Sequence, residues 1–327
     1  MKKVMAKLFP ILRILFVVGL LSFMILKMGQ DKIWELLKSV NYSLFALVFV
    51  FLSIEAVLRS YNWSILLKCK GVHLPLRKIT YAYITGSFFG YFVPSSLGTD
   101  VSRFIALSKQ TAIRMEDSVV TVVALNITGL IALLLSAGLS ASGLAFVMEE
   151  KLPFILIGAG SLTGIVAFSL IVYNREKLRT LIQFKGKLQK IVDKIWKMVD
   201  AFTVFEKHTP LLIKVFGLSF VIQILATLSV YTISLSLHSE ISILYFFLFM
   251  PMIAISRLIP ISIAGFGAEQ GIFVSLFLLV GVDPTESFLI STLLSSAAML
   301  FIVAGGLVYV ISETAKFGKP RPPVRPT

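Results

Sequence analysis

The chain has 327 residues, of which 57% are hydrophobic and only 15% are charged, with a mean hydropathy of +0.91. This composition excludes a soluble globular protein and indicates a polytopic membrane protein. Lys+Arg outnumber Asp+Glu by 31 to 17, but the cations lie in short segments between apolar runs. That distribution is typical of membrane orientation, so we expect no nucleic-acid partner. Cys69 is the only cysteine, which excludes an intramolecular disulfide and a cysteine metal cluster.

The chain begins with a predicted first span at residues 8–26. A basic start before an apolar run resembles a signal peptide, but no small-residue cleavage site follows, so we expect a retained span. Residues 31–40 have apolar side chains at helical spacing and predict an interfacial helix. The second span, residues 42–66, carries Glu55 and Arg59. These two lie four residues apart, hence on one helix face, where they can form an ion pair.

The next apolar run, residues 81–93, is too short to cross a membrane. Thirteen helical residues cover about 20 Å, whereas the hydrocarbon core is about 30 Å thick. The run ends at the sequence PSSLGTD, after which a second short helix at residues 101–107 leads back toward basic residues. We therefore predict a re-entrant hairpin that enters and leaves on the same side.

A second broken segment is the sequence RLIPISIAGFGAEQG, residues 257–271, inside the apolar run 241–280. Proline and glycine interrupt helices, and irregular backbone survives in hydrocarbon only where protein or a water-filled cavity satisfies its polar groups. Ionisable residues at that depth, here Arg257 and Glu269, indicate a functional site. We predict a hairpin from the opposite side, although two full spans would give the same sidedness and stay open as an alternative.

The remaining apolar runs predict spans at residues 117–139, 153–173, 211–235 and 288–311. The polar segment 174–209 has leucine, isoleucine and phenylalanine every seven residues and several lysines in another sector. It predicts a basic amphipathic helix, broken near Gly186, on an anionic leaflet, with a partner-binding helix as the alternative. The proline-rich basic tail, residues 312–327, is predicted to be disordered.

The distribution of cations predicts the topology. With hairpins that return to their own side, 24 of the 31 Lys+Arg fall on the side of the N-terminus and four on the other side. This ratio places both termini in the cytoplasm and the protein in the cytoplasmic (inner) membrane. The fold class is therefore an all-α polytopic membrane protein with about six full spans and two oppositely oriented hairpins.

The order of spans and hairpins repeats in the two halves of the chain with opposite orientation. One membrane domain, residues 1–311, would consist of repeat one at about 1–140 and repeat two at about 152–311. Such inverted repeats are typical of transporters whose substrate site lies where the interrupted helices meet.

Two motifs, PSSLGTDVSRF from Pro94 and IPISIAGFGAEQG from Ile259, resemble the paired signatures of the flippase-like family typified by the membrane half of lysylphosphatidylglycerol synthases. The positions that match the family's proline, glycine, arginine and glutamate signatures are Pro94, Gly98, Arg103, Pro260, Gly265, Gly267 and Glu269. The resemblance implies a role in moving lipids or lipid-linked precursors. No soluble aminoacyl-transferase domain follows, so synthase activity is not implied, and the Ile-Ser-Ile-Ala run at 261–264 leaves the substrate's identity open.

The candidate substrate-binding residues share a charged side chain near a predicted hairpin: Arg257, Glu269, Arg103, Glu55, Arg59 and Asp100. Arginines and helix N-termini suit a phosphate, and the carboxylates can neutralise the arginines when the site is empty. The hairpin tips would contribute backbone at Pro94, Gly98, Pro260, Gly265 and Gly267. Alternatively, the Glu55–Arg59 and Arg257–Glu269 pairs only staple helices, and Arg103 and Asp100 are solvated.

The leading functional hypothesis is transport of an anionic lipid or lipid-linked precursor, without a cofactor and without ATP hydrolysis, because no P-loop is present. An intramembrane enzyme acting on lipid phosphates or glycolipids is the runner-up. Its general base or metal site is hard to assemble from three histidines that lie far apart in sequence. An accessory scaffold for a lipid synthase is the third. The expected partners are membrane lipids, with a homo-oligomer or a lipid synthase left open.

Overall fold

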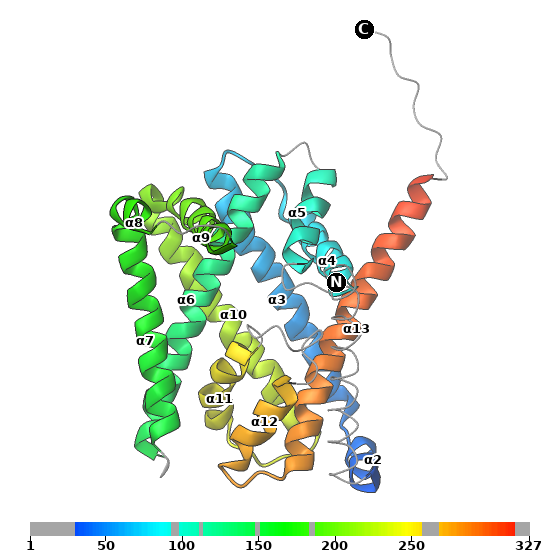
Figure 1. Ribbon diagram of the computed structural model, residues 1–327. Coiled ribbons are helices and arrows are strands. Elements are labelled where there is room, and N and C mark those ends of the chain that lie inside the picture. Colours follow the sequence, from blue (N-terminus) through cyan, green and yellow to red (C-terminus); the bar gives the residue numbers. More distant parts are fainter. Residues whose placement is uncertain are drawn as a thin grey trace, which may run out of the picture.

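The computed structural model describes residues 30–92, 98–110, 114–147, 151–182, 187–256 and 268–317. Within these ranges every regular element is a helix (Figure 1). Five of the described helices, α3, α6, α7, α10 and α13, are long and apolar enough to cross a membrane, and shorter apolar helices accompany them. The chain is therefore an all-α polytopic membrane protein, as predicted. The predicted first span, residues 8–26, lies outside the described residues.

The described helices follow in chain order as α2 (Gln30–Lys38), α3 (Tyr42–Cys69), α4 (Leu76–Phe92), α5 (Gly98–Gln110), α6 (Met115–Val147), α7 (Leu152–Tyr173), α8 (Arg175–Leu181), α9 (Lys187–Thr203), η1 (Glu206–His208), α10 (Thr209–Ser236), α11 (Ile243–Ser256), α12 (Ala268–Leu278) and α13 (Pro284–Phe317). Capping residues and prolines explain where several of these helices begin. Asn41 caps α3 by accepting from the amides of Ser43 and Leu44. Pro210 and Pro284 lie in the first turns of α10 and α13, where a missing N–H costs no helical hydrogen bond.

Several boundaries differ from the prediction. The span predicted at residues 117–139 forms α6, which begins at Met115 and continues to Val147, because residues 140–147 contain no proline. The last helix continues to Phe317, past the predicted end at residue 311. In the first hairpin, α4 begins at Leu76 rather than at residue 81, and α5 runs from Gly98 to Gln110 rather than from 101 to 107. At α4, α5 and α13 the helix includes polar or basic residues that flank the apolar run from which it was predicted.

Two pairs of short helices enter the bundle from opposite ends (Figure 1). Helices α4 and α5 both reach the end where α3 finishes, whereas α11 and α12 both reach the opposite end. Helix α11 has 14 residues, which cover about 21 Å and cannot span the hydrocarbon core. Helix α12 has 11 residues, so neither described helix of the second interrupted run is long enough to span, as the predicted hairpin requires. The alternative of two full spans depends on the residues between them. The two tips, residues 93–97 and 257–267, lie outside the described residues.

The helix contacts follow an inverted repeat. Helices α3 and α10 pack against each other, α4 packs against α13 as α11 packs against α6, and α5 packs against α6 as α12 packs against α13. Exchanging α3 with α10, α4 with α11, α5 with α12 and α6 with α13 therefore maps these contacts onto one another. An inverted repeat requires such a pattern of contacts, and the division of the chain into two repeats at about 1–140 and 152–311 stays a prediction.

The connections that carry most cations all lie at one end of the bundle. The links between α3 and α4, between α5 and α6, and from α7 to α10 are at this end, which we call the cation-rich end (Figure 1). The segment predicted as one broken amphipathic helix forms α8, α9 and η1 there. Helix α8 ends at Leu181 and α9 begins at Lys187, and the predicted break near Gly186 lies outside the described residues.

Candidate functional site: a charged cavity beside the first hairpin

A cavity of about 140 Å³ lies between α3, α4, α5 and α13. Helices α3 and α13 line it mainly with apolar side chains, including Leu52 and Phe301. Its polar lining residues are Glu55, Arg59, Tyr83, Ser87 and Arg103. Three of the six charged residues predicted for the site therefore face one cavity, although they come from two separate parts of the sequence.

Glu55 and Arg59 form the predicted ion pair on one face of α3. The Arg59 Nη2 atom lies 2.6 Å from Glu55 Oε1, and Arg59 Nε donates to the same oxygen at 2.8 Å. A glutamate four residues before its cation is the favourable order on a helix. The Arg59 side chain is 42% exposed and Glu55 only 15%. Arg59 is therefore the more accessible of the two to a ligand that enters the cavity.

Arg103, on α5, is held by three groups. Its Nε donates to Ser87 Oγ at 3.1 Å, its Nη1 lies 3.4 Å from Asp100 Oδ1, and its guanidinium lies 4.1 Å from the centre of the Tyr83 ring. The stacked ring and the serine fix the plane of the guanidinium, so the arginine enters the site already oriented. The reading of Arg103 and Asp100 as merely solvated is not what the geometry shows, since both side chains are about four-fifths buried.

Asp100 also ties the first hairpin to the next span. Its Oδ2 accepts from Asn126 Nδ2 on α6 at 2.6 Å, while Oδ1 faces Arg103. Asp100 lies in the first turn of α5, where the helix dipole favours a carboxylate. The result is a chain of polar contacts from α6 through Asp100 to Arg103 and on to Tyr83 and Ser87 on α4.

Glycines allow the helices around the cavity to approach closely. A Cβ atom at Gly86 of α4 would overlap the backbone of Arg103, and one at Gly306 of α13 would overlap the Phe88 ring. Gly305 is similarly close to Ile84. These contacts set the spacing of α4 between α5 and α13, and therefore the width of the cavity.

The other predicted site residues either lie elsewhere in the described structure or fall outside the described residues. Glu269 is buried in the first turn of α12, in the second hairpin, and is not among the residues that line the cavity. Gly98 begins α5 at the first tip. Arg257, Pro94, Pro260, Gly265 and Gly267 lie outside the described residues, so the Arg257–Glu269 pair and the meeting of the two tips stay predictions.

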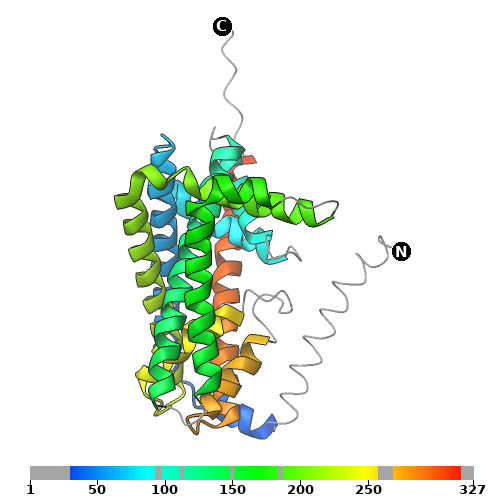
Figure 2. The same ribbon diagram turned by 60° about the vertical axis from the view of Figure 1, so that its left-hand side comes forward.

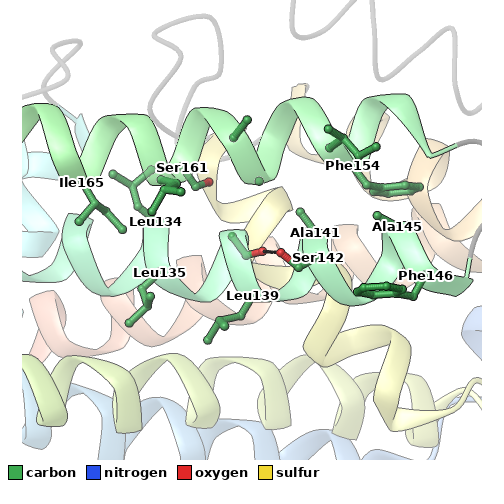
Figure 3. A pocket seen from close by; sticks show the side chains of 15 residues that line it. Leu134, Leu135, Leu139, Ala141, Ser142, Ala145, Phe146, Phe154, Ser161 and Ile165 are labelled. Atoms are coloured by element: carbon green, nitrogen blue, oxygen red, sulfur yellow. Dashed lines mark hydrogen bonds between the residues drawn. The ribbon is translucent and has the colours of Figure 1, made fainter.

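A second, larger hollow of about 500 Å³ separates α6 from α7 (Figure 3). Leu135, Leu139, Phe154 and Ile165 are among the residues that line it. Its one hydrogen bond in Figure 3 joins the Ser142 hydroxyl to the Gly138 carbonyl at 2.8 Å. The hollow is lined by aliphatic and aromatic groups and contains no charged side chain, so it has no chemistry comparable with that of the charged cavity.

Sequence reasoning missed Tyr83, Ser87 and Asn126. Tyr83 and Ser87 are four residues apart on α4 and therefore share a face. Asn126 is an amide inside an otherwise apolar span, which is a signal that could have been used. Among the described residues no group of three His, Cys, Asp or Glu side chains could hold a metal ion.

Comparison with known proteins gives one family. A family model described as the lysylphosphatidylglycerol synthase TM region matches residues 11–306, which include both hairpins and every residue of the charged cavity. No curated protein matches the chain.

Proposed function

The chain belongs to the family of the lysylphosphatidylglycerol synthase TM region, and from this premise we propose that it moves the headgroup of an anionic lipid or lipid-linked precursor across the bilayer. The family indicates a multi-pass membrane protein associated with lipid metabolism or transport. The single observation that carries the proposal is the placement of two guanidinium groups, Arg59 and Arg103, on one cavity between membrane helices.

The chemistry of the cavity suits a phosphate. Guanidinium groups bind phosphate oxygens with paired hydrogen bonds, and they are less strongly hydrated than ammonium groups. Each arginine is paired with its own carboxylate, Arg59 with Glu55 and Arg103 with Asp100. The pairing avoids an uncompensated charge at membrane depth. An entering phosphate would exchange with these carboxylates as the partner of the arginines, while the acyl chains remain in the surrounding lipid.

We place the protein in the cytoplasmic membrane with its cation-rich end toward the cytoplasm, following the distribution of Lys and Arg. The first hairpin would then open the cavity toward the inner leaflet. Translocation of this kind changes no covalent bond, and we therefore propose a transporter rather than an enzyme. It needs no cofactor.

Reconstituted vesicles test the proposal. They contain the purified chain and phosphatidylglycerol with a fluorophore on one acyl chain, and an impermeant reductant reports how fast inner-leaflet lipid becomes accessible. Arg103→Ala and Arg59→Ala should each slow transport by about 10- to 100-fold, because a hydrogen bond to a charged group contributes about 1.5–3 kcal/mol and 1.4 kcal/mol is a factor of ten.

Arg114→Ala is the matched control. Arg114 pairs with Asp117 three residues later, as Arg103 pairs with Asp100 three residues earlier, but its side chain is 80% exposed and lies outside the cavity. The control should transport at the wild-type rate. If folded Arg59→Ala and Arg103→Ala proteins both transported lipid at the wild-type rate, the proposal would be wrong. If the lipid recovered from the vesicles were chemically altered, the protein would be an enzyme.

A further inference from the structure

We propose that α8 and α9 form a docking surface for anionic lipid headgroups at the cation-rich end, separate from the charged cavity. Both helices run across the end of the bundle and project sideways from it, instead of continuing along the spans (Figure 2). Nothing in the transport proposal uses this segment. Its position beside the ends of the spans is the level at which lipid headgroups surround a membrane protein.

One face of α9 is anchored on the bundle. Trp196 and Val199 are buried, and α9 packs against α6. The Phe202 ring lies 5.4 Å from the Phe168 ring of α7, edge to face. This anchoring fixes which sector of α9 is left uncovered.

The uncovered sector combines apolar side chains with lysines. Ile195 and Met198 are large exposed hydrophobic residues three positions apart, and so they are neighbours on the helix surface. Lys194 and Lys197 are exposed beside them, with Lys194 four residues before Met198. An apolar strip bordered by lysines is the pattern of a helix that lies in a membrane surface, with its ammonium groups level with the phosphates.

Ion pairs hold this segment in place and occupy two of its acidic groups. Arg175 donates to both carboxylate oxygens of Glu206, at 2.7 and 3.1 Å. The Arg179 Nη2 atom lies 2.6 Å from Asp200 Oδ2, and the Arg179 Cζ atom lies 5.4 Å from the centre of the Trp196 ring. The carboxylates of Glu206 and Asp200 are therefore engaged with arginines of α8, while the exposed Asp193 accepts from Gln189 at 2.8 Å. The exposed Lys194 and Lys197 outnumber that one carboxylate and leave net positive charge to face an external anion.

The observations favour a lipid surface over an acidic protein as the partner. Lysines alone would suit either, because both offer negative charge. The exposed Ile195 and Met198 require an apolar environment next to that charge, and the sideways projection of α9 beside the spans places them where acyl chains begin (Figure 2). A soluble acidic partner is an outcome that the test separates.

The test uses the full chain with a single reporter. Cys69 is the only native cysteine, so Cys69→Ser combined with Met198→Cys allows an environment-sensitive fluorophore on α9 alone. The labelled protein is placed in nanodiscs of phosphatidylcholine, with or without phosphatidylglycerol. We expect the emission to shift to shorter wavelength in the anionic discs, and the shift to weaken as salt is added.

Lys194→Gln with Lys197→Gln should reduce the shift by about half or more, since each cation near the surface contributes to the attraction. Arg77→Gln with Lys78→Gln removes the same charge from exposed positions at the start of α4, at the same end of the bundle, and should leave the shift unchanged. Equal emission in both discs, or equal losses in the two double variants, would overturn the proposal. So would a shift that appears only when a soluble acidic peptide is added. The readout does not depend on transport, so it can fail while the transport proposal stands.

Discussion

The two hairpins occupy equivalent places in the inverted repeat but differ in what fills the space beside them. The first hairpin, α4 and α5, borders a cavity lined by Arg59 and Arg103, each of which is paired with a carboxylate. The second, α11 and α12, is packed with four fully buried phenylalanines: Phe246, Phe249, Phe273 and Phe277. Their rings contact one another, with Phe273 and Phe277 stacked at 4.4 Å between centroids.

The two hairpins have similar backbone arrangements, but their side chains differ: those of one fill the space beside it and those of the other leave a charged cavity. The phenylalanines belong to the large core cluster that joins α10, α11, α12 and α13, so the second hairpin is a packed part of the bundle. Around the first hairpin, the corresponding volume is left open and charged. A substrate path from the cation-rich end would therefore reach the arginines first and meet the packed hairpin beyond them.

The largest expected effect is the loss of an aromatic ring in the second hairpin. Phe277→Ala should lower the free energy of unfolding by about 3–5 kcal/mol, because it leaves a cavity among buried rings. Phe301→Ala, on the wall of the existing charged cavity, should cost less than half as much. Denaturant unfolding in detergent measures both. Equal losses of unfolding free energy would mean that the second hairpin and the wall of the charged cavity are equally well packed, which would contradict the difference between the two hairpins.

Glycine substitutions give the next largest effect. Gly86→Ala should destabilise the protein by about 1–3 kcal/mol, because the new methyl group overlaps the backbone of Arg103. Gly271 on α12 has open space where its Cβ would be, so Gly271→Ala should be neutral or raise stability by up to about 1 kcal/mol. Thermal unfolding of the two variants compares the hairpins directly. A tolerated Gly86→Ala would show that α4 and α5 can separate without cost.

A smaller effect is expected where the first hairpin is tied to α6. Asn126→Ala removes the 2.6 Å hydrogen bond to Asp100 and should cost about 1 kcal/mol in unfolding. Transport should slow as well, since Asp100 then no longer orients Arg103 from a fixed position. Asn126→Asp would place two carboxylates together and should be worse than alanine in both measurements. An Asn126→Ala protein with unchanged transport would reduce the residue to a packing role.

The smallest effect on stability belongs to Glu55→Gln. Glutamine keeps an amide oxygen that can accept from Arg59, whose side chain is partly exposed, so the change should alter the unfolding free energy by about 0.5 kcal/mol or less. The same change frees Arg59 from its carboxylate. We expect the lipid concentration that half-saturates transport to fall, because the phosphate no longer competes with Glu55. An unchanged half-saturating lipid concentration would indicate that the Glu55–Arg59 pair only stabilises the helix.

Much of the fold could be predicted because it depends on lengths and breaks along the chain. The run at 81–93 is too short to span, so the first hairpin followed from elementary dimensions. The polar break at 257–271 predicted the second hairpin but left two full spans as an alternative. The Glu55–Arg59 pair followed from helical spacing. The contacts of Arg103 did not, because its approach to Tyr83 and Ser87 depends on how α4 and α5 pack across Gly86. Spacing along one helix is visible in a sequence, whereas the register between two helices is set by their packing.

The central claim is that the space between α3, α4, α5 and α13 admits a charged headgroup. Adjacent alanines on α13 test it, in a chain whose single cysteine is removed by Cys69→Ser. Ala298 lines the charged cavity, whereas Ala297 is fully buried in the core cluster that contains the four phenylalanines. The measurement is the rate at which a charged, membrane-impermeant thiol reagent labels Ala298→Cys and Ala297→Cys in vesicles. The account predicts rapid labelling at position 298, slowed by added anionic lipid, and little at position 297. Equal protection of both positions would contradict it.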